Sequence, residues 1–322
     1  MKNPLVSVII PNYNHARFLD DRIQSVLNQT YQNFEVIILD DKSTDNSVEV
    51  INKYKDNPHV SHIVVNEENS GSPFKQWHKG FELAKGEWIW IAESDDYCKS
   101  VFLEECILRL NSSNNTAIVF CTSLLVDTTG KPCVLKDVSE NIPDGCVNGH
   151  FFIKRYMLKR NSIWNASAVL FKKYNAIHVK PIYMDYKAAG DHLFWCLLAE
   201  HGDVVHVAKH LNYFRQHNVK VTPYSFLDGT IHFEELKTIK YLVERGYLGF
   251  FRKIMVFRFY YRQLLSFGYN SESVRKRLID AWNDAIWIPA FVFKLDYLFN
   301  NMYQRLRHWI FVGISRFVRP LK

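Results

Sequence analysis

The sequence lacks several features that define common classes of protein. Its six cysteines form no C-x-x-C pair, which disfavours a zinc framework and predicts reduced, partly buried thiols. The longest charge-free apolar run near the C-terminus, residues 285–293, is far shorter than the roughly 18 residues of a membrane-spanning helix. The apolar run at 5–11 is too short for a signal peptide. We therefore expect a cytoplasmic protein without disulfides.

Two glycine-rich phosphate-binding motifs are also missing. The segment PNYNH (11–15), which follows the first predicted strand, contains no glycine. A G-x-G-x-x-G loop is therefore absent there, which disfavours a nicotinamide dehydrogenase. The chain has no G-x-x-x-x-G-K-[ST] sequence either, which disfavours a P-loop ATPase.

The composition allows a sizeable core, and the charge is unevenly distributed. The 322 residues, 48% of them hydrophobic, suffice for one large domain or for a domain with an extension. Residues 1–229 carry 24 Lys and Arg against 26 Asp and Glu, a net charge of −2. Residues 230–322 carry 16 against 7, a net charge of +9, and together they give the total of +7. The basic excess therefore lies in the last third.

Short apolar runs alternate with helical patterns in the first hundred residues. Strands are predicted at 5–11, 34–41, 59–66 and 88–92, with helices between them. This alternation predicts a parallel sheet covered by helices on both faces, with ligands bound at the carboxyl ends of the strands. Further along we predict strands at 117–126 and 167–173, a helix at 190–202, a last pair of strands within 204–217, and helices from about 230.

The fourth predicted strand continues directly into acid. In WIWIAESDDY (88–97), an apolar run is followed by Glu93, Asp95 and Asp96. Such acids are often a solvated turn or a helix cap. Carboxylates crowded at the end of a buried strand are costly without a cation, however, and carboxylates with substrate phosphates are the usual ligands of Mg²⁺ or Mn²⁺. We therefore predict a divalent cation that bridges to a diphosphate.

A second acidic pair, Asp40 and Asp41, ends the strand predicted at 34–41. Either residue could simply cap the next helix. A functional alternative is a hydrogen bond between one of them and a nucleobase or a ribose hydroxyl, as acids at early strand ends form in dinucleotide folds.

At this point the sequence resembles a known family. The segments VSVIIPNYNHARFLDDRIQSVLNQTYQNFEVIILDDKSTDNS and NSG…KGFELAKGEWIWIAESDD look like the nucleotide-sugar-binding half of family-2 glycosyltransferases. The resemblance is strong over about residues 5–100 and weak over 101–222. It implies an α/β fold of the GT-A type, a three-layer sandwich with a mostly parallel central sheet, here with a helical C-terminal extension. It also implies an enzyme that is usually inverting.

The resemblance implies roles for particular residues. Pro11, Tyr13 and Asn14 match the segment that lines the nucleotide site in the family. Asp41, with Asp40 beside it, matches the acid that binds the base. Asp95 and Asp96 match the motif that holds the metal and the diphosphate. Glu93 stands where an aspartate is commoner, although its longer side chain could still reach the cation.

Two further sites complete the prediction. Asp191 matches the acid that removes the proton of the acceptor hydroxyl, and an ordinary helix N-cap is the alternative. Arg215 and His217 alternate along the chain and so share a face, where a cation and a metal ligand would suit a diphosphate leaving group. A structural His217, bonded to the backbone, is the alternative. The Q-x-x-R-W signature of processive synthases is absent, which suggests transfer of a single sugar.

The C-terminal region interleaves arginine with aromatic residues, as in FFRKIMVFRFYYRQL (250–264). Its helices could pack on the catalytic domain or on a second copy in a homodimer. Alternatively, residues 250–322 could lie on an anionic membrane surface, with the protein peripheral on the inner face of the cell membrane. Nucleic acid is not expected as a partner.

We therefore expect two regions and one activity. Residues 1–229 form the catalytic domain, with a nucleotide-sugar half at about 1–100 and an acceptor half at about 101–229, and residues 230–322 form the helical region. The predicted reaction transfers one sugar from a nucleotide-diphospho-sugar to a hydroxyl of a glycan or lipid-linked acceptor, in polysaccharide or cell-surface glycan synthesis. Alternatives are a sugar nucleotidyltransferase, disfavoured by the missing glycine-rich basic loop, and a non-catalytic nucleotide-sugar binding protein.

Overall fold

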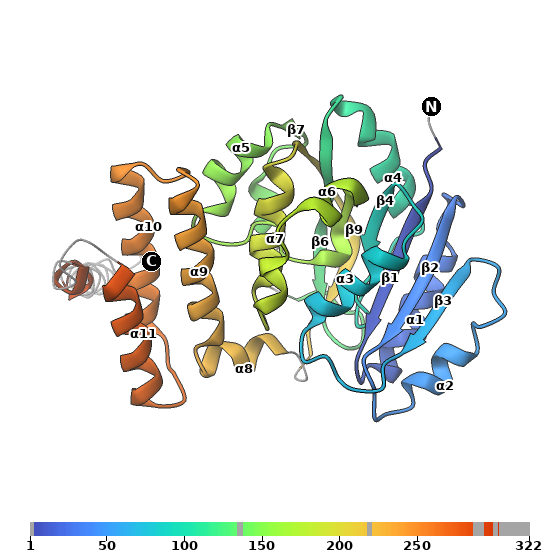
Figure 1. The fold of residues 1–322 in the computed structure, drawn as a ribbon, viewed down its shortest axis with the longest axis horizontal. Coiled ribbons are helices and arrows are strands. Elements are labelled where there is room, and N and C mark those ends of the chain that lie inside the picture. Colours follow the sequence, from blue (N-terminus) through green and yellow to red (C-terminus); the bar gives the residue numbers. More distant parts are fainter. Residues whose placement is uncertain (1–2, 134–137, 218–220, 286–292, 299–301, 303–322) are drawn as a thin grey trace, which may run out of the picture. The chain divides into compact units, whose positions relative to one another are not determined.

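The computed structural model describes residues 3–133, 138–217, 221–285, 293–298 and 302 (Figure 1). The chain divides into two compact units, residues 1–223 and residues 224–322. The sequence analysis placed its own boundary at 229. All six cysteines are free thiols, and four of them are buried.

A single mixed sheet forms the centre of the first unit. Its strands are ordered β3-β2-β1-β4-β8-β6-β9-β5, and β7 also pairs with β9. The strands are β1 (Val6–Asn12), β2 (Phe34–Asp40), β3 (Val60–Val65), β4 (Trp88–Ile91), β5 (Tyr97–Cys98), β6 (Thr116–Val126), β7 (Gly145–Val147), β8 (Val169–Lys172) and β9 (Asp203–Arg215). The helices of this part of the chain are α1 (Ala16–Leu27), α2 (Ser47–Asn52), α3 (Pro73–Leu83), α4 (Phe102–Arg109), α5 (Gly149–Phe152), α6 (Lys173–His178), α7 (Gly190–Ala199) and α8 (Val221–Leu227), which crosses the division.

The strand directions agree with the predicted mostly parallel sheet. β1 pairs in parallel with β2 and β4, and β2 with β3. β8 runs antiparallel between β4 and β6, and β6 pairs in parallel with β9. The strands predicted at 5–11, 34–41, 59–66 and 88–92 are confirmed.

The prediction of two strands within 204–217 is wrong. This segment is the single strand β9, which pairs with β6 from Thr116 to Val126. The ladder is irregular near Thr122, which pairs with His210 where the preceding pair is Cys121 with Val207. β9 therefore contains an irregularity of the β-bulge kind but continues in the same direction, instead of forming a hairpin of two strands.

The alternation of side chains along β1 directs core residues to both faces of the sheet. Val6, Val8 and Ile10 belong to a buried cluster that also contains side chains of α1 and α4. Ile9 points to the other face, where α3 packs. A Cβ atom on Gly80 of α3 would lie 2.6 Å from Ile9 Cγ2, so glycine lets this helix approach the strand closely. Figure 1 shows α3, α6 and α7 together in front of the strands.

The carboxyl ends of β1, β2 and β4 meet at one edge. The backbone N–H of Asp41 donates to Asn12 O at 2.9 Å, and that of Ala92 donates to Ile9 O at 2.8 Å. The three loops that leave these strands are therefore neighbours, as the parallel arrangement requires. Asp40, Asp41 and Asp95, which the sequence analysis predicted as site residues, lie in these loops or at the ends of these strands.

The second unit is helical in its described part, with α9 (Thr230–Glu244), α10 (Phe250–Ser266) and α11 (Glu272–Ala285). Tyr260 and Trp282 are fully buried and stack with ring centroids 5.1 Å apart. Among the residues that the structure describes, no helix has both the length and the apolar composition to cross a membrane. Most of the predicted membrane segment beyond 285 lies outside the described residues.

Candidate active site at the carboxyl edge of the sheet

The loop after β1 is tied to the loop after β2. Asn14 has a left-handed backbone, with φ of 57°, which asparagine adopts more readily than most residues. Its N–H donates to Ser43 Oγ at 2.9 Å, and its Oδ1 accepts from the N–H of Thr44 at 2.7 Å. Pro11 is buried within β1, whereas Tyr13 is 46% exposed at the edge. Tyr13 is thus accessible to a ligand.

Asp40 anchors these two loops from inside. It is fully buried and accepts hydrogen bonds from Asn12 Nδ2 at 2.7 Å, from the N–H of Ser43 at 2.8 Å and from Ser43 Oγ at 2.7 Å. A buried carboxylate needs such donors because it has lost its hydration. The contacts of Asp40 therefore shape the edge.

Asp41 holds the segment between β3 and α3. Its Oδ1 accepts from Asn66 Nδ2, from the N–H of Ser70 and from Gln76 Nε2 at 2.7–2.9 Å, and its Oδ2 accepts from Ser70 Oγ at 2.8 Å. The side chain is almost wholly buried. Any contact with a nucleobase would share the carboxylate with these donors.

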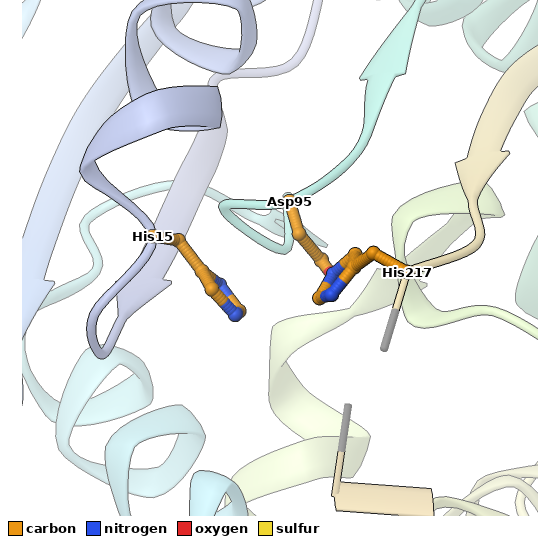
Figure 2. A group of neighbouring side chains, drawn as sticks. All are labelled: His15, Asp95 and His217. Carbon is orange, nitrogen blue, oxygen red and sulfur yellow. The ribbon is translucent and has the colours of Figure 1, made fainter. Parts of the chain in front are cut away.

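Three side chains from separate segments converge at this edge (Figure 2). His15 precedes α1, Asp95 follows β4, and His217 follows β9. One potential ligand atom from each lies within 4.8 Å of the others. His217 Nε2 lies 2.9 Å from Asp95 Oδ2, and the two imidazole rings meet edge to face at 5.5 Å. We call these residues the His–Asp–His group, and their donor atoms suit a divalent cation.

Two of the three side chains in this group are largely shielded from solvent. The side chain of His217 is 1% exposed and that of Asp95 is 13% exposed. His217 thus contacts a carboxylate, in place of the backbone partner considered as an alternative. His15 was missed by the sequence analysis, and its only signal was its position in the loop directly after the first strand.

Asp96 is hydrogen-bonded to residues outside the His–Asp–His group. Its Oδ2 accepts from Asn165 Nδ2 at 2.7 Å and from Ser167 Oγ at 2.8 Å, and its Oδ1 accepts from the N–H of Arg215 at 3.0 Å. The residue is 1% exposed. The structure does not bring Asp96 into the group that contains Asp95.

Arg22 lies beneath the acidic loop and was also missed. It is fully buried in α1 and donates from Nε to the carbonyl oxygen of Glu93 at 2.8 Å. Its Nη2 is 4.0 Å from Asp96 Oδ2, and its guanidinium lies over Trp90 at 5.8 Å. The only signal was an arginine next to Ile23 on the apolar face of the helix. This buried charge balances Asp96.

Glu93 is also outside the His–Asp–His group. Its Oε1 accepts from Trp77 Nε1 at 2.9 Å. Burial, with a further contribution from the negative charge of Asp95, raises the pKa of Glu93 to about 8. Trp77 also packs on Phe194 of α7, so Glu93 connects the acidic loop, through Trp77, to the helix whose first turn contains the predicted base.

Asp191 occupies the first turn of α7, where the helix dipole favours a negative charge. Its Oδ2 accepts from Asn161 Nδ2 at 2.8 Å. The next residue, His192, is buried, and this burial lowers its pKa to about 4. His192 is therefore neutral near pH 7, and it contacts the carbonyl oxygen of Met157 at 2.8 Å.

Arg215 lines a pocket of about 350 Å³ beside α1. Its guanidinium lies 4.4 Å from the ring centre of Phe18 and 5.0 Å from that of Tyr97. Its Nη2 contacts Asp21 Oδ2 at 3.1 Å. The side chain is therefore held by an aromatic pair and by one exposed carboxylate.

Comparison with known proteins identifies the first part of the chain. The model of glycosyl transferase family 2 matches residues 7–161. A putative teichuronic acid biosynthesis glycosyltransferase, TuaG of Bacillus subtilis, is 39% identical over 129 residues, which are 40% of this chain and 50% of that protein. The glycosyltransferase GlyG of Streptococcus pneumoniae is 35% identical over 117 residues, 36% of this chain and 38% of that protein. The chain thus spans about half or less of the length of these relatives.

Solved structures share the fold across most of the chain. TarS 1-349 of S. aureus in complex with UDP-GlcNAc superposes with a TM-score of 0.62 at 17% identity, covering 87% of this chain and 80% of that one. The mannosyltransferase PcManGT of Pyrobaculum calidifontis, in complex with GDP-Man and Mn²⁺, gives 0.57 at 14% identity, covering 96% and 84%. At these identities the likeness concerns the fold. Residues 7–161 are thus similar to glycosyl transferase family 2, and the chain has the GT-A fold expected from its sequence.

Proposed function

We propose that this protein is an inverting, metal-dependent glycosyltransferase. It moves one sugar from a nucleotide-diphospho-sugar to a hydroxyl of a glycan or lipid-linked acceptor, in polysaccharide or cell-surface glycan synthesis. The observation that carries the proposal is the His–Asp–His group at the carboxyl edge of β1, β4 and β9. The names of the relatives, which include a teichuronic acid biosynthesis enzyme, agree with it.

The donor would lie along the edge formed by the loops after β1, β2 and β4. Tyr13 is exposed there, and Pro11, Asn14, Asp40 and Asp41 shape the surface around it. When bound, a divalent cation would neutralise the charge of the leaving diphosphate. Asp95 and His217 would hold that cation, with Arg215 as a nearby positive charge.

Asp191 is the proposed general base. In an inverting transfer the acceptor hydroxyl attacks the anomeric carbon opposite the leaving diphosphate, and the hydroxyl proton passes to a carboxylate. The hydrogen bond from Asn161 Nδ2 leaves Asp191 oriented at the first turn of α7. A sugar nucleotidyltransferase and a non-catalytic binding protein remain the alternatives, and turnover distinguishes them.

Calorimetry with nucleoside diphosphates tests the donor site. We expect one member of a panel of diphosphates to bind the full chain in the presence of Mn²⁺. Binding should weaken by about tenfold or more after chelation with EDTA, because the diphosphate then loses its bridging cation. The matching nucleotide sugars should then be turned over with an acceptor extract. If none of the diphosphates binds, either with metal or without it, the proposal is contradicted.

We also propose that the C-terminal region binds anionic membranes, which would place the enzyme at the inner face of the cell membrane. At the start of α10, Phe250, Phe251 and Met255 are 56%, 79% and 54% exposed, and Arg252 between them is exposed as well. Apolar side chains next to arginine suit the interface of an anionic bilayer. The alternative, a homodimer, also stays a prediction.

Liposome flotation tests this surface. The full chain is expected to float with vesicles that contain anionic lipid and to float less at high salt. Phe250→Asp combined with Phe251→Asp should reduce the floating fraction several-fold, because apolar burial is replaced by charge repulsion. Leu108→Asp, at a 54% exposed residue of α4, is the matched control. Equal flotation of all three proteins would exclude this face as the membrane contact.

A further inference from the structure

We propose that His15 is a third protein ligand of the cation, so that the site selects a transition-metal ion over Mg²⁺. The inference rests on the proposed function, because it concerns the cation of the same site. It assigns a role to a residue of the loop after β1, a segment otherwise expected to contact the nucleotide. The cation class follows from the donor atoms that three separate segments supply.

The separations within the His–Asp–His group fit one ion. Bonds from a transition metal to nitrogen or oxygen are roughly 2.0–2.2 Å long, so two ligands of one ion lie at most about 4.3 Å apart. The ligand atoms of His15, Asp95 and His217 already lie within 4.8 Å of one another. His217 Nε2 and Asp95 Oδ2, at 2.9 Å, are close to the spacing of roughly 3 Å expected for neighbouring ligands. A shift of about half an ångström completes the site.

The burial of the His217 ring favours its neutral form. Its side chain is 1% exposed, and its Nδ1 has no hydrogen-bond partner within the described part of the chain. The nitrogen that would bind the ion is Nε2, which lies beside Asp95 Oδ2, so the ring proton would be on Nδ1. Neutral imidazole is the form of histidine that binds metals.

His15 is held as metal-binding histidines usually are. Its Nδ1 contacts Ser94 Oγ at 2.9 Å, and Ser94 is 2% exposed. A ligating histidine generally forms such a hydrogen bond through the ring nitrogen that does not bind the ion, and the contact fixes the orientation of the ring. Since Ser94 precedes Asp95 in the chain, one short loop positions two of the three donors.

Two imidazoles and one carboxylate determine which ions suit the site. Mg²⁺ and Ca²⁺ prefer oxygen ligands, whereas imidazole favours transition ions such as Co²⁺ and Zn²⁺. With Asp95 alone the site would take Mg²⁺ readily, but each imidazole shifts the preference. We therefore expect the order Co²⁺ over Mn²⁺ over Mg²⁺.

The test measures metal binding directly on the full chain. Metal-free protein is titrated with Co²⁺, followed by its visible absorption, and with Mn²⁺, followed by the resonance signal of the free ion, each with and without competing Mg²⁺. His15→Ala should weaken Co²⁺ and Mn²⁺ binding by about tenfold or more and change the Co²⁺ spectrum. His15→Gln, which keeps a polar partner for Ser94, should do the same. His178→Ala, at an exposed histidine of α6, should leave both unchanged.

The outcomes separate this inference from the proposed function. Unchanged Co²⁺ affinity and spectrum in both folded His15 variants would overturn the inference, and so would a wild-type chain that binds no transition ion but still transfers sugar. If the wild-type chain binds Co²⁺ through His15 and yet binds no nucleoside diphosphate, the inference stands and the proposed function fails. Circular dichroism of each variant confirms that the fold is intact.

Discussion

Replacing Asp96 with alanine is expected to lower the free energy of unfolding by about 3–5 kcal/mol, because it leaves the charge of Arg22 buried without its carboxylate. Asp96 and Arg22 are 1% and 0% exposed. The same change also removes the acceptor of Asn165 Nδ2 and Ser167 Oγ. Replacing the neighbouring Asp95 should cost only about 1 kcal/mol, the scale of one hydrogen bond such as that with His217. It should also remove cation binding.

Urea denaturation and Co²⁺ titration of the full chain measure the two effects side by side. Asp144→Ala is a control for the loss of an ion pair, since Asp144 pairs with Arg109 at 3.1 Å on the surface and such pairs contribute about 0–1 kcal/mol. If Asp96→Ala unfolds like the wild type but no longer binds Co²⁺, then Asp96 is a metal ligand, as the family resemblance implied. That result would also refute the structural role inferred from its contacts.

Asp191→Asn is expected to lower the rate of sugar transfer by roughly 10²–10⁴-fold, the usual contribution of a positioned general base. A carboxamide cannot accept the proton of the acceptor hydroxyl. It nearly matches the carboxylate in size, so the fold and the donor site should be unaffected. The dissociation constant of the nucleoside diphosphate should therefore stay within about twofold of the wild-type value.

Single-turnover assays at saturating donor, with calorimetry of the diphosphate, separate these quantities. Asp185→Asn is the matched control, because Asp185 is an exposed carboxylate shortly before α7. It should retain the wild-type rate. Full transfer activity in Asp191→Asn with unchanged donor affinity would remove Asp191 from the mechanism. Asp191 would then be the ordinary acid of a helix first turn.

The strands of the first half could be predicted because their residues satisfy local and global requirements together. β1 and β2 are runs of β-branched and apolar residues that are buried along their whole length, as expected for central strands of a parallel sheet. Their carboxyl ends meet at one edge for the same reason. β9 was harder, because a strand that is irregular near its middle reads as two strands when its partner β6 is unknown.

The order of residues along the chain was sufficient to predict the parallel sheet and the acidic residues at its edge, because these depend on local patterns of polarity, and its motifs carried the resemblance to family 2. It was not sufficient to separate Asp95 from Asp96, which are the same residue type at adjacent positions. In the tertiary structure Asp95 meets His217, 122 residues away, whereas Asp96 is 4.0 Å from Arg22. His15 likewise lies near Asp95 and His217 only because the chain folds distant segments together. Which carboxylate faces a ligand and which faces a buried arginine is decided by contacts between segments that are distant in the sequence, and no local pattern encodes those contacts.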